Sequence, residues 1–490
     1  MPAALLWTIV LPAFATPLIY FLGRRSQKLA AIALIASSVL AMGVLATTAP
    51  VVMSEGRYVE PYSWIPMLGS TFSLFVDGVS LSLAMVTLVL VICAAIFSID
   101  YMQDKKGLPQ YYALLSLLTV GLVGVFITSC LLTFYLFWEL MLVPTYFIVG
   151  AWGYRNPFRA ALKFFIFTHT GAVFVLLGIG AIYASTGTLD MFEARRLLAT
   201  ASPGLLNWIL AAVTLGFAVK MAIVPVHVWL PDTHSEAPAP MSALLSGVII
   251  EAGAYAILRV SLGTIFPALT DVVVTHEFLK ILAIFGVVSA FYGAFAALGG
   301  TDIKRVVAYS SVSHMGYVLY GLSLFSFPEG FIGAVLHLVN HAASKGLLFL
   351  NAGSVMKETG ERNIDKMGGL AAKMPLTAVS STISALSIAG TPGFACFVSE
   401  FLMFSAGFKA SQVDSFYVAP TVLMLIATVL SLGYALRFLW KVFLGHSHTQ
   451  RARGAHRFMM ASMVILTILV VLLGLWPAPF IELISSVGFP

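Results

Sequence analysis

Five ionisable residues lie inside apolar stretches that are long enough to cross a bilayer: Glu139, Lys220, Glu251, Lys345 and Glu400. A charged side chain at the centre of a membrane costs roughly 2.5–3.5 kcal/mol on insertion scales. Residues of this kind usually line ion or proton pathways, and five of mixed sign in one chain indicate a polar route. A buried carboxylate needs a proton or a cationic partner, and burial favours the neutral form of a lysine. The expected chemistry is movement of protons or ions across the membrane.

A second group of titratable residues forms a regular pattern in the segment VLHLVNHAASKGLLFL. His337, His341 and Lys345 fall at positions i, i+4 and i+8, which places them on one face of a helix. Histidine titrates near neutral pH and passes protons between its two ring nitrogens, so this stripe suits a relay. Two histidines at this spacing could also bind a metal, but no acid or cysteine accompanies them, and we predict no metal site. His314, in AYSSVSHMGYV, either extends the same line or donates to a backbone carbonyl.

Glu139, in FYLFWELMLVPTYF, and Lys220, in GFAVKMAIVPVHVWLPDTH, carry opposite charges in two different spans. We expect them to pair, and we expect separation of the pair to release a proton. The alternative is a static salt bridge that holds two helices together. His227 follows Lys220 near the membrane and is expected to support the relay. Three further residues of this region either admit protons or are ordinary loop residues: Asp232, His234 and Glu236.

The remaining two acids occupy the later spans. Glu251, in LLSGVIIEAGAYAILR, is expected to continue the relay from Lys220. Its alternative role is a fixed ion pair, through an intervening group, with Arg259, which lies eight residues along on nearly the same helix face. Glu400, in GTPGFACFVSEFLMF, is the last acid at mid-membrane and suits the exit of a relay.

The elements that position these residues are predicted to be membrane helices. The chain is 60% hydrophobic and only 10% charged, a balance that excludes a soluble globular protein. Its apolar runs are continuous rather than alternating, which favours helices over a β-barrel. At about 20 residues per crossing, 490 residues allow roughly 14 spans in a single membrane domain, 1–490. The predicted spans are 4–22, 29–50, 79–99, 112–128, 131–152, 163–185, 207–228, 241–262, 279–298, 307–326, 331–355, 377–407, 417–438 and 457–477.

Two of these spans contain helix breakers beside a buried charge. Pro225 follows Lys220, and Pro392 lies in a Gly-Thr-Pro-Gly sequence that precedes Glu400. Proline removes a backbone donor, and the freed carbonyl can bind water or a side chain. Interrupted helices in corresponding positions are typical of ion sites in transporters that are built from repeats.

The 27 lysines and arginines are distributed unequally between alternate loops. Most of them fall on one side, in loops such as 24–28, 105–106 and 155–163, and few fall on the other. The positive-inside rule makes the basic loops cytoplasmic and puts both termini on the non-cytoplasmic side. The net charge of +6 therefore reflects topology and does not indicate nucleic-acid binding. The three cysteines lie far apart in apolar segments and no Gly-rich phosphate loop is visible, so we predict no cofactor.

Three long motifs carry a resemblance to a known family: KMAIVPVHVWLPDTHSEAPAPMSALLSG, DIKRVVAYSSVSHMGYV and NHAASKGLLFLNAG. They resemble the proton-translocating antiporter-like subunits of respiratory complex I (NADH:quinone oxidoreductase). Related subunits occur in Mrp-type antiporters and membrane-bound hydrogenases. The resemblance extends from about residue 70 to 440. It implies an all-α polytopic membrane protein of 14 helices, in which helices 4–8 (112–262) and 9–13 (279–438) form two inverted repeats with broken helices 7 and 12.

The resemblance also implies roles for individual residues. Glu139 and Lys220 match the acid of helix 5 and the lysine of helix 7. Glu400 falls at the helix-12 position, which is acidic in the M-like members of complex I, and the chain ends without a long lateral helix. Two residues depart from the M-like pattern. Glu251 stands where those members usually carry lysine, and Lys345 matches a lysine of the L-like, Mrp-like and hydrogenase-linked members.

The implied function is that of a membrane subunit in a redox-driven proton pump, within an NADH:quinone oxidoreductase-like enzyme. Such a subunit would hold no cofactor and have no catalytic activity of its own. The resemblance implies a prokaryotic inner membrane, sister antiporter-like subunits and peripheral redox subunits as partners, and no nucleic acid. One alternative is an Mrp-type Na⁺/H⁺ antiporter subunit without redox input. Another is a scaffold with a vestigial channel, for which neutralising Lys220 or Glu400 would leave pumping intact.

Overall fold

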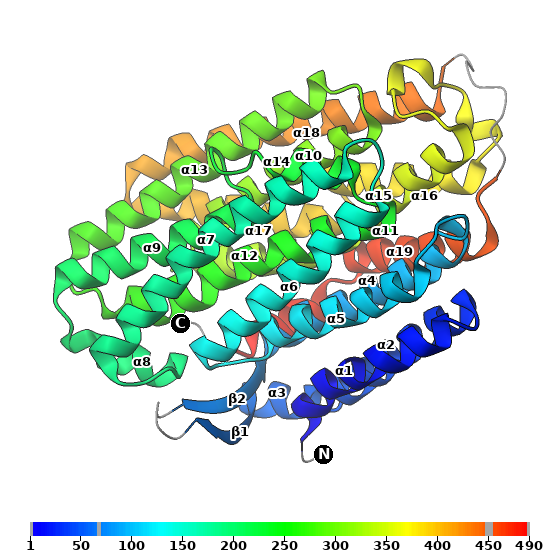
Figure 1. Ribbon diagram of the computed structural model, residues 1–490. Coiled ribbons are helices and arrows are strands. Elements are labelled where there is room, and N and C mark those ends of the chain that lie inside the picture. The colour runs from blue at the N-terminus through cyan, green and yellow to red at the C-terminus, as the bar shows by residue number, and fades with distance from the viewer. Residues whose placement is uncertain (1–2, 66–69, 446–453, 488–490) are drawn as a thin grey trace.

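Long helices that run side by side build one bundle, with a small β-hairpin at one end (Figure 1). The computed structural model describes residues 3–65, 70–445 and 454–487. The helices up to the first interruption are α1 Ala4–Gly23, α2 Gln27–Ala46, α3 Ala49–Glu55, α4 Gly78–Tyr101, α5 Leu108–Phe126, α6 Leu131–Trp152, α7 Pro157–Thr186, α8 Met191–Leu197 and α9 Pro203–Met221. The later ones are α10 Leu230–Glu236, α11 Ala239–Leu244, α12 Ile250–Ala256, α13 Val272–Gly299, α14 Ile303–Ser323, α15 Pro328–Thr359, α16 Pro375–Ile388, α17 Ala395–Val413, α18 Val418–Phe443, α19 Arg457–Leu475 and α20 Ala478–Ser485.

Each predicted span coincides with one or more of these helices. Within the described residues, 11 segments are long and apolar enough to cross a membrane. The helices α14, α15, α16 and α17 do not meet that criterion. In α14 and α15 polar side chains interrupt the apolar sequence but are buried inside the protein, and a break divides α16 from α17. The chain is thus a multi-pass membrane protein, and the total of 14 spans stays a prediction.

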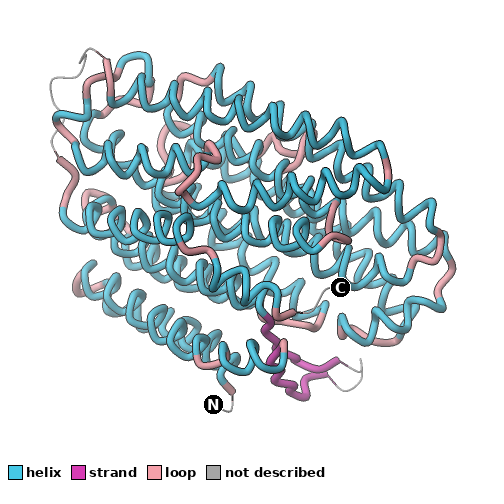
Figure 2. Tube along the Cα trace, turned by 180° about the vertical axis from the view of Figure 1, so that it is seen from behind, coloured by secondary structure: helices cyan, strands magenta, loops and turns pink. Residues whose placement is uncertain are grey.

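The two strands were not predicted from the sequence. β1 (Arg57–Ile65) and β2 (Ser70–Asp77) pair antiparallel, with Arg57 opposite Asp77, and Figure 2 shows the hairpin beside the N-terminus. Glu60 on β1 accepts hydrogen bonds from the backbone amides of Leu5 and Leu6 at 3.0 and 3.1 Å. These amides belong to the first turn of α1 and have no partner within the helix, so the hairpin fixes the start of that helix.

The two predicted interruptions divide helices in the structure. The first lies between α9 and α10, where Ala222 has a left-handed backbone (φ 60°) and Pro225 lies in the connecting loop. The indole of Trp229 donates to the carbonyl of Val219 at 2.9 Å, which satisfies one of the carbonyls left free at the end of α9. The second interruption, with Pro392, separates α16 from α17.

The helical segment that carries Glu251 has an irregularity that the sequence did not reveal. Two π-helical stretches, η3 (Leu245–Ile249) and η4 (Ile257–Ile265), flank α12. A π-turn bonds residue i to i+5 and changes which side chains share a face. Short π-stretches occur frequently at functional sites, and here they enclose the seven residues of α12, about two turns, that carry the buried acid.

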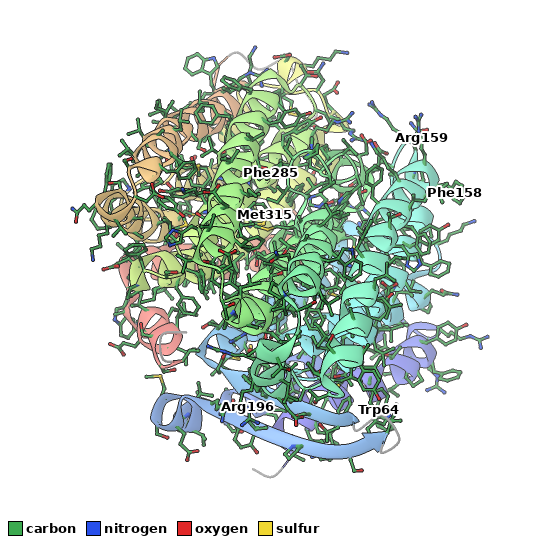
Figure 3. The ribbon with its side chains drawn as sticks, turned by 90° about the vertical axis from the view of Figure 1, so that its left-hand side faces the viewer. Trp64, Phe158, Arg159, Arg196, Phe285 and Met315 are labelled. Carbon is green, nitrogen blue, oxygen red and sulfur yellow. The ribbon has the colours of Figure 1, made fainter. Side chains whose placement is uncertain are left out.

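Ion pairs hold together the end of the bundle that lies opposite the hairpin. Figure 3 shows Phe158 and Arg159 at one end and Trp64 and Arg196 at the other. At the first end Lys163 pairs with Asp232 at 2.6 Å. The ion pairs of Arg362 at the same end are with Asp302 at 2.7 Å and Glu236 at 3.2 Å. Asp232 and Glu236, both on α10, therefore attach this helix to Lys163 and Arg362 at the end of the bundle opposite the hairpin.

Candidate ion pathway

The residues predicted to relay protons form a buried row across the bundle, with an acid and a histidine at its centre. Glu251 on α12 and His341 on α15 are 1% and 0% exposed, and 2.9 Å separates Glu251 Oε1 from His341 Nδ1. His341 Nε2 has no partner within the described part of the chain. A carboxylate and an imidazole in contact can exchange a proton without leaving a net charge unpaired. The free second nitrogen gives that proton an onward donor or acceptor position.

The alternative role of Glu251, an ion pair with Arg259, is wrong. Arg259 instead donates to Asp77 at the start of α4, and its guanidinium lies 5.4 Å from the ring centroids of Phe75 and Tyr255. η4 is a π-helix, in which the residues that share a helix face differ from those of an α-helix. The eight-residue spacing therefore does not bring Arg259 close to Glu251.

Two further histidines continue the row away from Glu251. His314 on α14 and His337 on α15 are fully buried, with 3.1 Å between His314 Nδ1 and His337 Nε2. The ring of His314 lies 5.6 Å from that of His341. His314 Nε2 contacts the Tyr434 hydroxyl at 3.0 Å, and His337 Nδ1 contacts the Ser399 hydroxyl at 3.0 Å. Four helices thus contribute to one connected group of titratable and hydroxyl side chains.

Glu400 lies at the far end of this group. The side chain projects from α17, is 3% exposed in total, and its Oε1 has no hydrogen-bond partner among the described residues. Ligand atoms of Glu400, His314 and His337 all lie within 4.8 Å of one another. Two histidines and a carboxylate are a donor set that zinc accepts, so these three residues could hold a metal where the sequence predicted none. Among the described residues no hydrogen bond joins Glu400 to either histidine, so a proton would pass between them through water or after a small side-chain movement.

Gly390, in the break between α16 and α17, makes the space for Glu400. Its φ of 65° favours glycine, and a Cβ at this position would lie too close to Glu400 Oε2.

We expect Gly390→Ala to displace the carboxylate and to slow proton transport several-fold, and to lower the stability of the fold by about 1–2 kcal/mol because alanine disfavours this backbone conformation. Gly393→Ala is the matched control because its φ is 88° but nothing lies within 4 Å of its added Cβ. Equal transport in the two variants would contradict the role given to this space.

Lys345 is placed beside the histidines but does not bond to them. Its ammonium is fully buried and donates to the hydroxyl of Ser310 and, at 3.5 Å, to the carbonyl of Val307. It lies one turn from His341 on α15, as the spacing predicted. A positive charge at this position acts on every neighbouring imidazole in the row.

The predicted direct pair of Glu139 and Lys220 is wrong. Glu139 Oε2 contacts His169 Nδ1 on α7 at 3.2 Å, and the Glu139 side chain is 24% exposed. Lys220 is buried in α9, and its ammonium lies 4.7 Å from the ring centroid of Trp138. Within the described ranges no ion pair joins the two residues. The Glu139 side chain is only partly exposed, its Oε1 is buried without a hydrogen-bond partner among the described residues, and its charge attracts the Lys220 ammonium through space.

His169 is the residue of this region that the sequence analysis missed. An ionisable side chain in the middle of the predicted span 163–185 was an available signal. We expect His169→Ala to lower proton transport several-fold, because Glu139 would lose its hydrogen-bond partner inside the membrane. Thr170→Ala is the control, since among the described residues the Thr170 hydroxyl bonds only to the carbonyl of Ile166 on its own helix. Transport rates measured in vesicles that are alike for the two variants would contradict this role.

Two histidines follow the first break. His227 is 4% exposed, its ring lies 4.5 Å from that of Tyr292, and its Nδ1 has no partner among the described residues. His234 on α10 is fully buried between Trp229 and Phe349, and neither of its ring nitrogens has a partner there. An unpartnered buried imidazole is costly, so water is the expected partner of both. His234 is thus not an ordinary loop residue.

The row is not continuous. Among the described residues no hydrogen bond connects Lys220 to Glu251, although α9 packs against α12. Glu251 contacts His341, and His314 contacts His337, with Glu400 close to both of these histidines. Glu139 instead contacts His169, and Lys220 lies over the ring of Trp138.

Comparison with known proteins places these residues in a family. The model for the transmembrane part of the "NADH:quinone oxidoreductase/Mrp antiporter" family matches residues 128–434. The chain belongs to this family. A second model, for the N-terminus of chain 5 of NADH-ubiquinone oxidoreductase (complex I), matches residues 64–112. The antiporter-family match contains Glu139, Lys220, Glu251, Lys345 and Glu400.

Individual relatives agree with the family match. The chain is 33% identical over 439 residues to F(420)H(2) dehydrogenase subunit M of Methanosarcina mazei, covering 88% of this chain and 86% of the relative. It is 33% identical over 432 residues to NADH-quinone oxidoreductase subunit M of Escherichia coli, covering 86% and 82%.

Solved structures of the antiporter family share the fold. A chain of the Mrp complex from Dietzia sp. superposes with a TM-score of 0.88 at 24% identity, covering 99% of this chain and 96% of that one. A chain of respiratory complex I from Thermus thermophilus gives a TM-score of 0.83 at 23% identity, covering 99% of both. A chain of an archaeal membrane-bound sulfane sulfur reductase gives 0.84 at 28% identity, covering 97% and 76%.

Proposed function

We propose that this chain is a proton-translocating, antiporter-like membrane subunit of a redox-driven pump of the complex I type or of a related complex. The observation that carries the proposal is the buried row in which Glu251 contacts His341, and His314 and His337 lie between that pair and Glu400. Fully buried acids and histidines in mutual contact are expensive in a membrane unless they serve transport. The relatives named above as subunits of oxidoreductase complexes support a redox-linked role.

The electrostatic step begins at Glu139, which is the exposed end of the row. A change of charge next to the Glu139–His169 pair alters the attraction that Glu139 exerts on the Lys220 ammonium. When that attraction weakens, the buried ammonium is destabilised by desolvation and gives up its proton. Water carries the proton across the gap to Glu251, and His341 passes it towards the other histidines.

The end of the route is Glu400. The proton reaches the His314–His337 pair and then the carboxylate, whose Oε1 has no protein partner among the described residues. The Lys345 ammonium disfavours a second positive charge on the histidines, so a proton that arrives is driven onward to the acid.

The arrangement of the complex follows from the surface of the chain. Glu139 and His169 lie at the outer surface within membrane helices, and a sister antiporter-like subunit next to them would supply the change of charge. Peripheral redox subunits would supply the energy, and the chain would contribute translocation, not catalysis, to the enzyme. We further propose that 112–262 and 279–438 are inverted repeats and that both termini face the non-cytoplasmic side.

A second candidate function is an Mrp-type Na⁺/H⁺ antiporter subunit. The superposition on the Mrp complex at a TM-score of 0.88 and the buried Lys345 favour it. Mass spectrometry of the native complex purified through this chain separates the two. Peripheral iron–sulfur subunits would support the redox pump, whereas small membrane partners alone would favour the antiporter and make Na⁺ the first ion to test.

The transport role is tested in proteoliposomes that contain the intact complex. We expect Lys220→Ala to reduce proton transport by about tenfold or more, because the variant cannot bind a proton at this position. Lys280→Ala is the control, since Lys280 pairs with Glu277 and Asp414 at the surface of the bundle. Wild-type transport by Lys220→Ala would contradict the proposal and favour a vestigial channel.

A further inference from the structure

A cavity of about 420 Å³ opens at the end of the bundle that carries the hairpin. The residues that line it come mainly from α3, both strands of the hairpin, α8, η4 and α15, and the charged ones are Glu55, Arg57, Asp77, Arg195 and Arg259. A cavity of this volume holds several water molecules, and the charged lining favours them. The cavity is separate from the row described above.

A chain of hydrogen bonds runs from this cavity into the protein. At its inner wall Arg259 pairs with Asp77 and also reaches the hydroxyl of Ser80 at 3.4 Å. The Ser80 hydroxyl lies 3.0 Å from that of Tyr255, which also donates to the carbonyl of Phe126 at 2.9 Å. Ser80 and Tyr255 are 0% and 1% exposed, so these polar contacts continue beyond the water-accessible wall.

The inner end of this chain lies next to the central pair. Tyr255 and Glu251 are four residues apart in α12, so they lie on one face of the helix, one turn from each other. Glu251 in turn contacts His341. No hydrogen bond joins Tyr255 to Glu251 among the described residues, so the polar contacts that start at the cavity end one helical turn from the middle of the buried row, and water would bridge that turn.

We propose that this cavity is an aqueous vestibule through which the Glu251–His341 pair exchanges protons with the face of the membrane that carries the hairpin. The inference rests on the proposed function. A proton leaves the Glu251 carboxyl and reaches the Tyr255 hydroxyl through bridging water, and the Tyr255 proton turns from the Phe126 carbonyl to the Ser80 hydroxyl. Water then carries the proton given up by Ser80 past Arg259 to Asp77. Asp77 then gives the proton to water in the cavity, and the positive charges of Arg57 and Arg195 favour this release. The buried row thus has a second outlet for protons, which leads from the Glu251–His341 pair to the cavity.

The first test removes one hydroxyl from this second outlet. We expect Tyr255→Phe to slow proton transport by the intact complex by roughly threefold to tenfold, since one buried link is lost. Tyr111→Phe is the matched control, because Tyr111 is also fully buried and bonds to a serine of α4, Ser98, at 2.9 Å. The amounts of assembled complex should be equal in both variants. Equal transport rates for the two variants would overturn the proposal.

The second test blocks the cavity from outside. Glu55 lines the cavity, whereas its exposed neighbour Ser54 does not. In membrane vesicles of each orientation, Glu55→Cys and Ser54→Cys are modified with a bulky, membrane-impermeant maleimide. We expect modification of Glu55→Cys, from one side only, to slow transport severalfold relative to the same variant before modification, and modification of Ser54→Cys to have no effect. Unchanged transport after modification of Glu55→Cys would overturn the vestibule.

The two proposals fail in different ways. If Lys220→Ala transports protons at the wild-type rate, the proposed function fails. If Lys220→Ala stops transport but Tyr255→Phe and the modified Glu55→Cys transport normally, the row stands and the vestibule is wrong.

Discussion

Replacing Glu251 with glutamine is expected to reduce proton transport by the complex by about tenfold or more. Glutamine keeps the size of the side chain and can still accept from His341, but it cannot bind or release a proton. Glu251 is the acid that connects the Lys220 side of the row to the histidines, and it is 1% exposed, so bulk water cannot replace it. Proton uptake by proteoliposomes that contain the purified complex measures the effect.

The control for this experiment is another glutamate of the same protein. Glu329 lies at the start of α15 and pairs with Lys409 at the surface. Glu329→Gln is expected to leave transport within twofold of wild type, because the contribution of an exposed ion pair is small, about 0–1 kcal/mol. Transport by Glu251→Gln at the rate of Glu329→Gln would remove Glu251 from the pathway.

Replacing Glu400 with glutamine is expected to have an effect of similar size. The amide would occupy the place of the carboxylate beside His314 and His337 but could not take a proton from them. Glu400→Asp keeps an acid and shortens the side chain by one methylene, so it is expected to retain more transport than the glutamine variant. Proton uptake in the same proteoliposomes compares the two, and equal loss in both would indicate that shape and not acidity matters here.

Most of the helical architecture could be predicted from the sequence. A span of about 20 apolar residues leaves the backbone no alternative to a helix in lipid, so the ranges followed from hydropathy alone. The two interruptions followed from Pro225 and Pro392, because proline cannot complete the helical hydrogen bonds. The hairpin was missed because strand pairing depends on contacts between two short segments of mixed polarity, and a search for long apolar spans does not register them.

The site was predicted in part. The stripe of His337, His341 and Lys345 followed from helical spacing, and so did the burial of Glu251 and Glu400. The pairing of Glu139 with Lys220 was wrong, because hydropathy identifies spans but does not show which helix face points inward. The partner of Arg259 could not be predicted either. Asp77 is distant in sequence, and the π-stretch that turns Arg259 towards it has no signal in composition.

The central claim is that Glu251 gains and loses a proton during turnover, and infrared difference spectroscopy of the working complex tests it most directly. Protonated and ionised carboxyl groups absorb at different frequencies, so turnover should produce a carboxyl signal that shifts in D₂O. The account predicts that this signal is present in the native complex and in Glu329→Gln and absent in Glu251→Gln. A signal that persists unchanged in Glu251→Gln, or no carboxyl signal in a complex that transports protons, would contradict it.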